Sequence, residues 1–362
     1  MSESKLVEEL TKQDYTSQTW AEGETWSITV WNEDGLNDAS AIYQIRIPLP
    51  FSLRWVNAYA IYDQKEGWTL VDPGLRTAAA ELAWVQIIEH MNLTQGKVAS
   101  IVLTHYHPDH LGLAGWLQQR FQVPVLMSEI GWKHAQMLWG AGQTMTAKMQ
   151  HILQQHGVSR QVSDLVGKHM DSFIPLVSPL PQVTLVSDGE MVCFGGREWQ
   201  VIETHGHAPG HLSYYNEQYR VLLAGDHILP QISPNVSYMP GSDPEPLHHF
   251  LLGLERLAQL DAVLVLPGHR HPFVYFHSRI EDLLEHHEQR LMELRALLVT
   301  EQTAQELCAH LFGSTDRLTI HQFRFAMGET LAHLMELRRR KQVTTRQVDK
   351  VIVWKATAPE SD

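Results

Sequence analysis

The sequence predicts a mixed α/β fold, and three observations support this prediction. Between residues 56 and 104, apolar runs typical of strands surround one helical pattern, in the order strand, strand, helix, strand. Three further strand-like runs, at residues 199–204, 219–224 and 262–266, each end in a polar turn. From residue 278 the pattern becomes mainly helical. Because loops at one edge of a sheet are where sites are built, we expect these polar turns to meet.

Size and composition set the broad class of the protein. The 362 residues suit a large catalytic domain plus a smaller one, and 44% apolar residues suffice for a sizeable core. The formal net charge of −13 argues against nucleic acid or a membrane surface as a partner. The first ten residues lack the apolar region of a signal peptide, and the two cysteines lie far apart. We therefore expect a cytoplasmic protein that acts on a small molecule.

The first elements can be assigned in order along the chain. Residues 1–19 are polar and predict a short helix or no regular structure, whereas residues 20–31 and 42–47 alternate and predict strands. Residues 56–71 predict a hairpin, and an amphipathic helix follows over residues 77–91. The hairpin ends in Asp72, which is interpreted either as a turn-former or as a support for the loop that follows the next strand.

Residues 101–112 organise the chain, because an apolar strand leads there into four potential metal ligands. In extended backbone His105 and His107 point to the same side and can share one ion. After the following proline turns the chain, Asp109 and His110 can face a second ion. Such polar groups, crowded at the end of an apolar strand, would be costly without a cation. These ligand types predict zinc, with manganese or iron as alternatives.

The three downstream strands deliver further potential ligands in the same way. The polar turns that follow them are His205-Gly-His-Ala-Pro-Gly-His211, Gly225-Asp-His227 and Pro267-Gly-His269. Each turn offers imidazole or carboxylate groups at the end of a strand, so we expect them to complete the site.

These motifs together resemble those of the metallo-β-lactamase fold hydrolase superfamily, in particular its glyoxalase II-like members. They span about residues 40–275 and comprise T-H-x-H-x-D-H at 104–110, G-H-x-P-G-H at 206–211, G-D at 225–226 and P-G-H at 267–269. The resemblance implies an αββα sandwich, in which two mixed sheets pack face to face with helices outside.

The resemblance also implies a site that holds two divalent cations, with Zn²⁺ as the expected metal. By this resemblance, the first ion is held by His105, His107 and His207, the second by Asp109, His110 and His269, and Asp226 bridges the two. Two such cations can share one water, lower its pKa and hold the resulting hydroxide as a nucleophile. Either Asp109 or Asp226 is the expected proton shuttle to the leaving group.

Five neighbouring residues have less specific interpretations. His205 and His211 flank a ligand turn and are interpreted as structural groups rather than as ligands. His227 either hydrogen-bonds the substrate or is structural, and Arg270 either faces an anionic substrate or lies in a solvated loop. Tyr238 is a candidate oxyanion donor. Some lactone hydrolases of the family have a tyrosine three positions after the bridging aspartate, where this chain has leucine, which argues against a specialised lactonase.

An insertion at residues 128–182 separates the first and second ligand loops. Its helical spacing of Met, Trp and Leu predicts helices whose apolar faces pack on the core. Because of its position, we also hypothesise that it forms a lid over the metals and gives the substrate an apolar wall.

The C-terminal segment, residues 278–362, has a different character from the rest. Helical patterns at residues 280–299, 303–311 and 321–340 precede a predicted β-wing at 342–354. This order resembles a winged-helix-like C-terminal domain found in one branch of the superfamily. The expected division is therefore a polar segment 1–19, a catalytic domain 20–277 and this C-terminal domain. We expect the last domain to shape the pocket or to form a homodimer interface.

The leading functional interpretation is a dinuclear metal-dependent hydrolase that cleaves an ester, thioester or lactone of a small molecule. One alternative is an endoribonuclease or phosphodiesterase with the same ligands, whose RNA binding would depend steeply on salt. Another is a mononuclear iron enzyme of the persulfide dioxygenase type, because two histidines and one carboxylate suffice for iron. A non-catalytic binding protein is disfavoured, because the ligand set is complete.

Overall fold

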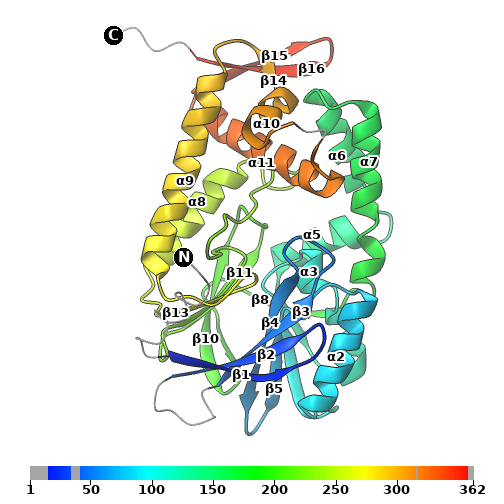
Figure 1. Ribbon diagram of the computed structural model, residues 1–362, viewed down its shortest axis with the longest axis vertical. Helices are drawn as coiled ribbons and strands as arrows, with labels where there is room; N and C mark the ends of the chain where they lie inside the picture. Colours follow the sequence, from blue (N-terminus) through cyan, green and yellow to red (C-terminus); the bar gives the residue numbers. More distant parts are fainter. Residues whose placement is uncertain (1–14, 34–40, 315–316, 358–362) are drawn as a thin grey trace.

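Two β-sheets packed face to face form one end of the molecule (Figure 1). The computed structural model describes residues 15–33, 41–314 and 317–357. Within these ranges, eight strands form the first sheet in sequence order: β1 (Tyr15–Glu22), β2 (Ser27–Glu33), β3 (Ile42–Pro48), β4 (Trp55–Asp63), β5 (Gly67–Val71), β6 (Val98–Val102), β7 (Val125–Ser128) and β8 (Val183–Val186). Pairs from β1 to β5 are antiparallel, and pairs from β5 to β8 are parallel.

The second sheet is also mixed. Its strands in the described chain are β9 (Met191–Phe194), β10 (Arg197–Thr204), β11 (His211–Asn216), β12 (Val221–Gly225) and β13 (Leu264–Pro267), in the spatial order β13-β12-β11-β10-β9. Strands β12 and β13 are parallel, and the other neighbours are antiparallel. The parallel pairs β5–β6 and β12–β13 each bring two strand ends to the same edge, which positions the loops that follow them.

The faces of the two sheets enclose an apolar core. Side chains from the first sheet, such as Ile61 and Val102, meet Trp199 and Tyr214 from the second. Helices α2 (Ala78–His90) and α4 (Ala114–Phe121) cover the outer face of the first sheet, and α8 (Pro246–Leu257) covers that of the second. Helix α2 begins where the Thr77 side chain accepts a hydrogen bond from the backbone of Ala80. These layers confirm the predicted αββα architecture.

The insertion between β7 and β8 is helical, as predicted. It contains α5 (Glu129–Trp139), α6 (Met145–Gln155), α7 (Arg160–Asp171) and the short 3₁₀-helix η2 (Ile174–Val177). On α6, Met145, Met149 and Leu153 are buried at a spacing of one helical turn. The apolar stripe of the insertion therefore packs into the main core of the protein.

The C-terminal segment packs against both the insertion and α8. Helix α11 (Ile320–Arg339) lies between α9 (Phe276–Leu297) on one side and α7 on the other, with α10 (Ala304–Phe312) beside it (Figure 1). Thr303 and Thr319 start α10 and α11 with reciprocal capping hydrogen bonds. A small sheet of β14 (Gln302–Thr303), β15 (Val343–Val348) and β16 (Val351–Ala356) completes this part and includes the predicted hairpin.

The structure corrects one expectation at the N-terminus. Strand β1 begins at Tyr15, so a helix or an irregular segment is wrong for the end of residues 1–19, while residues 1–14 lie outside the described part. Side chains 17–20 of this edge strand are exposed on both faces, so the sequence lacks the apolar alternation that signals a half-buried strand. None of the described helices is long and apolar enough to cross a bilayer.

Candidate metal centre

Four strand ends gather the predicted ligands at one site. Strand β6 leads into the loop with His105 and His107 and then into the short helix α3 (Pro108–Leu111). The turn between β10 and β11 carries His207, while Asp226 follows β12 and His269 follows β13. The structure brings all seven predicted ligands together, in two groups that share Asp226.

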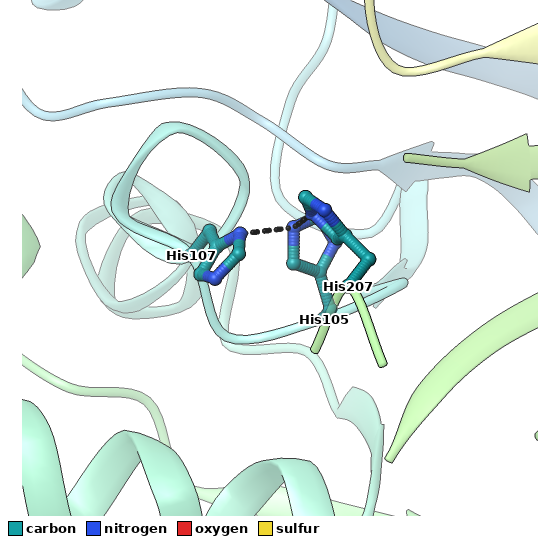
Figure 2. Close-up of side chains that lie close together, drawn as sticks. All are labelled: His105, His107 and His207. Atoms are coloured by element: carbon teal, nitrogen blue, oxygen red, sulfur yellow. Dashed lines mark hydrogen bonds between the residues drawn. The ribbon is translucent and has the colours of Figure 1, made fainter. Parts of the chain in front are cut away.

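The first group consists of three imidazoles. Nε2 of His105 lies 3.0 Å from Nδ1 of His107 and 3.4 Å from Nε2 of His207. Figure 2 shows the three rings with these nitrogens turned toward one another. Burial, followed by neighbouring imidazoles, lowers the pKa of His105 and His107 well below the usual value, and burial also lowers the pKa of His207. Neutral imidazoles offer lone pairs, so this group fits a cation.

The second group contains carboxylates as well as imidazoles. Oδ2 of Asp109 lies 3.1 Å from Nε2 of His269. Oδ2 of Asp226 lies 3.4 Å from Nε2 of both His110 and His269 and 3.7 Å from Nε2 of His207. A single carboxylate oxygen therefore faces both groups, as a bridging ligand requires.

The charges of the second group also fit bound cations. Burial lowers the pKa of His269, but the carboxylates of Asp226 and Asp109 outweigh this effect and raise it to about 10. Burial raises the pKa of Asp226, but His269 and His110 hold it well below its usual range. The Oδ1 atom of Asp226 is buried and accepts no hydrogen bond from the described residues. These buried carboxylates require nearby positive charge, which a divalent cation would supply.

Backbone carbonyls orient two of the imidazoles. Nδ1 of His207 donates to the carbonyl oxygen of Asn235 at 2.8 Å, and Nδ1 of His269 donates to that of Trp55 at 3.1 Å. Because a carbonyl only accepts, Nδ1 of each ring carries a proton. The neutral ring of His207 thus presents the lone pair of Nε2 to the centre, and Nε2 of His269 would do the same once a cation replaces its proton.

Asp72 orients the loop after β6 through a chain of hydrogen bonds. Its Oδ1 accepts from the backbone N–H of Thr104, and its Oδ2 accepts from the Thr104 hydroxyl at 2.6 Å and from Nδ1 of His110 at 2.8 Å. The Thr104 hydroxyl thus uses its single proton on Asp72 and accepts from Nδ1 of His105 at 2.9 Å. Of the two interpretations of Asp72, the structure supports the one in which it holds the histidine loop.

The flanking histidines lie outside both groups. His211 is buried, and its Nε2 accepts from the backbone N–H of Asp226 at 3.1 Å, so it positions the bridging residue. His205 accepts from the backbone N–H of Gly210 and is partly exposed beside Glu203. Both positions agree with the structural interpretation of these two residues.

A cavity of about 460 Å³ opens onto the metal centre, and we call it the central cavity. His107, Asp109, His207, Asp226 and His269 form one part of its wall. The rest is largely apolar and includes residues of the β3–β4 connection (Phe51, Leu53), the insertion (Leu138, Trp139, Met170, Phe173), the β12–α8 connection (Leu229, Ile232, Asn235, Met239, Asp243) and the C-terminal segment (Phe312, Leu318, His321, Arg324, Phe325, Glu329). This volume falls in the range that holds small-molecule ligands.

Three predicted substrate contacts do not reach this cavity. His227 is fully buried against the ring of Phe250, and Tyr238 packs on the core with its backbone hydrogen-bonded to α11. The backbone of Arg270 has a positive φ of 70°, which turns the chain directly after His269. None of the three is among the described residues that line the cavity, so the structure does not support their predicted substrate roles.

Sequence reasoning missed the polar residues that α11 contributes to the cavity wall. His321, Arg324 and Glu329 lie about one helical turn or slightly more apart in a helix whose buried residues are mostly apolar. The available signal was a charged pair inside this apolar pattern. Burial raises the pKa of Glu329 to about 6, although Arg290 and a hydrogen bond from Asn235 act in the opposite direction.

Comparison with known proteins identifies similar chains. The sequence pattern of the Metallo-beta-lactamase superfamily matches residues 54–269, and that of the metallo-beta-lactamase-like C-terminal domain matches residues 291–357. The crystal structure of a metallo-beta-lactamase family protein from Thermus thermophilus is 32% identical and covers 87% of this chain and 98% of its own, with a TM-score of 0.77.

Two proteins that are named as hydrolases are also similar to this chain. The probable metallo-hydrolase YqjP of Bacillus subtilis is 27% identical over 84% of this chain and 94% of its own length. The hydroxyacylglutathione hydrolase GloC of Haemophilus influenzae is 24% identical over 61% of this chain and 88% of its own length.

The burial of Glu329 predicts a pH-dependent stability effect. Between the ordinary value of 4.5 and about 6, the folded protein keeps a proton that the unfolded chain has released, so this residue destabilises the fold as pH rises. Glu329→Gln should therefore increase the free energy of unfolding by about 1 to 2 kcal/mol at pH 7.5 and by little at pH 4.5. Urea unfolding at both pH values measures this difference. Glu281→Gln, at an exposed position, is the control, and equal differences at the two pH values would contradict the prediction.

Proposed function

Since the chain belongs to the metallo-β-lactamase superfamily, we propose that it is a dinuclear metal-dependent hydrolase of small-molecule esters, thioesters or lactones. The observation that carries the proposal is the position of Asp226, whose Oδ2 faces His207 from one group and His110 and His269 from the other. The cations would be held by His105, His107 and His207 on one side and by Asp109, His110 and His269 on the other, with Asp226 between them.

Zinc is the metal that we propose for this donor set. Five imidazoles and two carboxylates suit zinc, and iron or manganese accept the same donors. When bound, two such cations supply an ionised water as the nucleophile and polarise the oxygen of the scissile carbonyl.

Asp109 is the better placed of the two candidate proton carriers. Its side chain is 20% exposed, whereas that of Asp226 is 7% exposed and is surrounded by imidazoles. Asp109 also lies on the wall of the central cavity, where a leaving group can reach it. We assign to the Asp109 carboxylate the transfer of the proton from water to the leaving group, and to Asp226 the task of holding the two sides together.

The shape of the cavity supports an acyl substrate with an apolar part. Leu138, Trp139, Met170 and Phe173 give it an apolar wall, which is the role hypothesised for the insertion. The similarity to a hydroxyacylglutathione hydrolase supports a thioester among the possible substrates. Apolar burial of the acyl chain would supply binding energy, while the metal centre acts on the carbonyl group.

A nuclease activity receives no support from the basic run at the end of α11. Arg339 and Arg340 form ion pairs with Glu336, at 2.7 Å each, and Arg340 also pairs with Glu288. Two of the four basic residues of this run, Arg338-Arg-Arg-Lys341, are thus already paired with carboxylates and offer little to a phosphate. The run instead behaves as the charged end of a helix.

We also propose a division of the chain into two domains. The catalytic domain would begin with β1 at residue 15 rather than at residue 20, and would end near residue 277, where α9 has begun. The C-terminal domain, with two capped helices and the β15–β16 hairpin, would be winged-helix-like.

Loss of the bridging carboxylate should remove both metal and activity. Metal analysis of the wild-type protein should give two equivalents of zinc, together with turnover of a thioester or ester in a substrate panel. Asp226→Asn should reduce the metal content and lower kcat/KM by at least about 100-fold, because the buried amide carries no charge. His277→Ala, which changes an exposed histidine on α9, should keep both properties.

Two outcomes of that experiment would contradict the proposal. One equivalent of iron with oxygen uptake would indicate the dioxygenase alternative. Unchanged turnover in Asp226→Asn would remove the bridging residue from the mechanism.

Trp139 should select for bulky acyl groups. Its Nε1 donates to the carbonyl oxygen of Tyr106 at 3.0 Å, which fixes the indole as part of the cavity wall. Trp139→Ala should lower kcat/KM for a hexanoyl thioester by about tenfold and for an acetyl thioester by much less, because only the longer chain uses the removed apolar surface. Trp139→Phe should keep most of the selectivity. Equal losses for both substrates would contradict the role of the insertion as a substrate wall.

A further inference from the structure

Arg324 on α11 lines the central cavity without an acidic partner. Its Nε is buried and has no hydrogen-bond partner, and its guanidinium lies 4.3 Å from the ring centroid of Phe325. No carboxylate of the described chain forms an ion pair with it, in contrast to Arg339 and Arg340 on the same helix. Among the described residues that line the cavity, it is the one arginine or lysine.

The burial of the Arg324 guanidinium without an acidic partner is energetically costly. Burial lowers the pKa of Arg324 to about 10, so the group remains charged at neutral pH. A partly buried cation with a single aromatic contact loses hydration that nothing in the described wall replaces. An anion that enters the cavity would restore these interactions through charge-assisted hydrogen bonds.

His321 lines the central cavity together with Arg324 and Asp109. Burial and the charge of Arg324 lower the pKa of His321 to about 4, and the Asp109 carboxylate acts in the opposite direction. The ring of His321 stacks on Phe51, with centroids 4.9 Å apart, and its Nδ1 lies 3.1 Å from Nε2 of His169. His321 is therefore a neutral, fixed part of the same wall that carries Arg324 and Asp109. One substrate molecule in this cavity can face both groups.

We propose that Arg324 binds a carboxylate that the substrate carries away from its scissile bond, so that the preferred substrates are monoanionic acyl esters or thioesters. This inference rests on the proposed hydrolase function. The flat guanidinium fork matches a carboxylate. Because Arg324 is the one arginine or lysine among the described residues of the wall, its single charge matches one carboxylate, whereas a phosphate dianion would leave a negative charge uncompensated.

Matched substrates test this assignment. One pair consists of the hexanoyl thioesters of 3-mercaptopropionate and of its methyl ester, and a second pair carries the carboxylate or methyl ester at the far end of an adipoyl group. In at least one pair the wild-type protein should prefer the carboxylate in kcat/KM by at least about tenfold. Arg324→Gln should reduce this preference to near unity, and Arg324→Lys should retain part of it. Arg338→Gln is the matched control, since Arg338 is exposed on the same helix and does not line the cavity.

A binding measurement separates this inference from the proposed reaction. Calorimetric titration of the metal-loaded protein uses amide analogues of both pairs, each with a terminal carboxylate or a terminal carboxamide. The carboxylate should bind at least about tenfold more tightly in the wild type and in Arg338→Gln, and this ratio should be lost in Arg324→Gln with unchanged metal content and melting temperature. If the thioesters are not cleaved but this pattern holds, the hydrolase proposal fails and the carboxylate site stands.

Two results would overturn the carboxylate site. The first is an equal carboxylate preference in the wild type and Arg324→Gln, or no preference in either pair. The second is tighter binding of the matching phosphate analogue than of the carboxylate, which would assign Arg324 to a different class of ligand.

Discussion

The burial of the Asp226 carboxylate is the constraint on which the rest of the site depends. Gly268 makes room for it, since a Cβ there would lie 2.2 Å from its Oδ1. Gly225 makes room for His211, which accepts from the backbone N–H of Asp226, since a Cβ there would lie 2.4 Å from Nε2 of His211. The surrounding imidazoles are held from outside by carbonyls and by Asp72, so their free nitrogens converge around this carboxylate. The glycines of the G-D and P-G-H motifs therefore allow the Asp226 carboxylate to be buried among the imidazoles.

The C-terminal helices complete the site rather than merely flank it. Asn235 accepts from His207 through its backbone and donates from its side chain to Glu329 at 3.2 Å, which links α11 to one of the predicted metal ligands. The same helix places Arg324 on the cavity wall. The central cavity thus combines an apolar wall from the insertion, a charged wall from α11 and a metal centre from the sheets. Such a combination suits a substrate with an acyl chain and a second polar group.

The sequence predicted the candidate metal centre better than the rest of the cavity, and the reason is physical. The local backbone at a strand end sets where the next side chains point. His105, His107 and His269 could therefore be assigned as ligands from short motifs. The charged pair of α11 was visible in the sequence, but that Arg324 lines the cavity depends on how α11 packs against distant elements, which no local pattern reveals. The sequence also left open whether Arg270, the residue after His269, faces the substrate. The positive φ of Arg270, which turns the chain directly after His269, is not visible in the sequence. Strand β1 was missed at its start because its exposed side chains lack apolar alternation.

Anomalous diffraction from crystals of the zinc-loaded protein tests the central claim most directly. Two anomalous peaks are predicted, one within about 2.0–2.2 Å of the nitrogens of His105, His107 and His207 and the other at the same range from Asp109, His110 and His269. Asp226 should contact both peaks. A single peak that lacks Asp226 as a ligand, or two peaks held by other residues, would contradict the dinuclear centre.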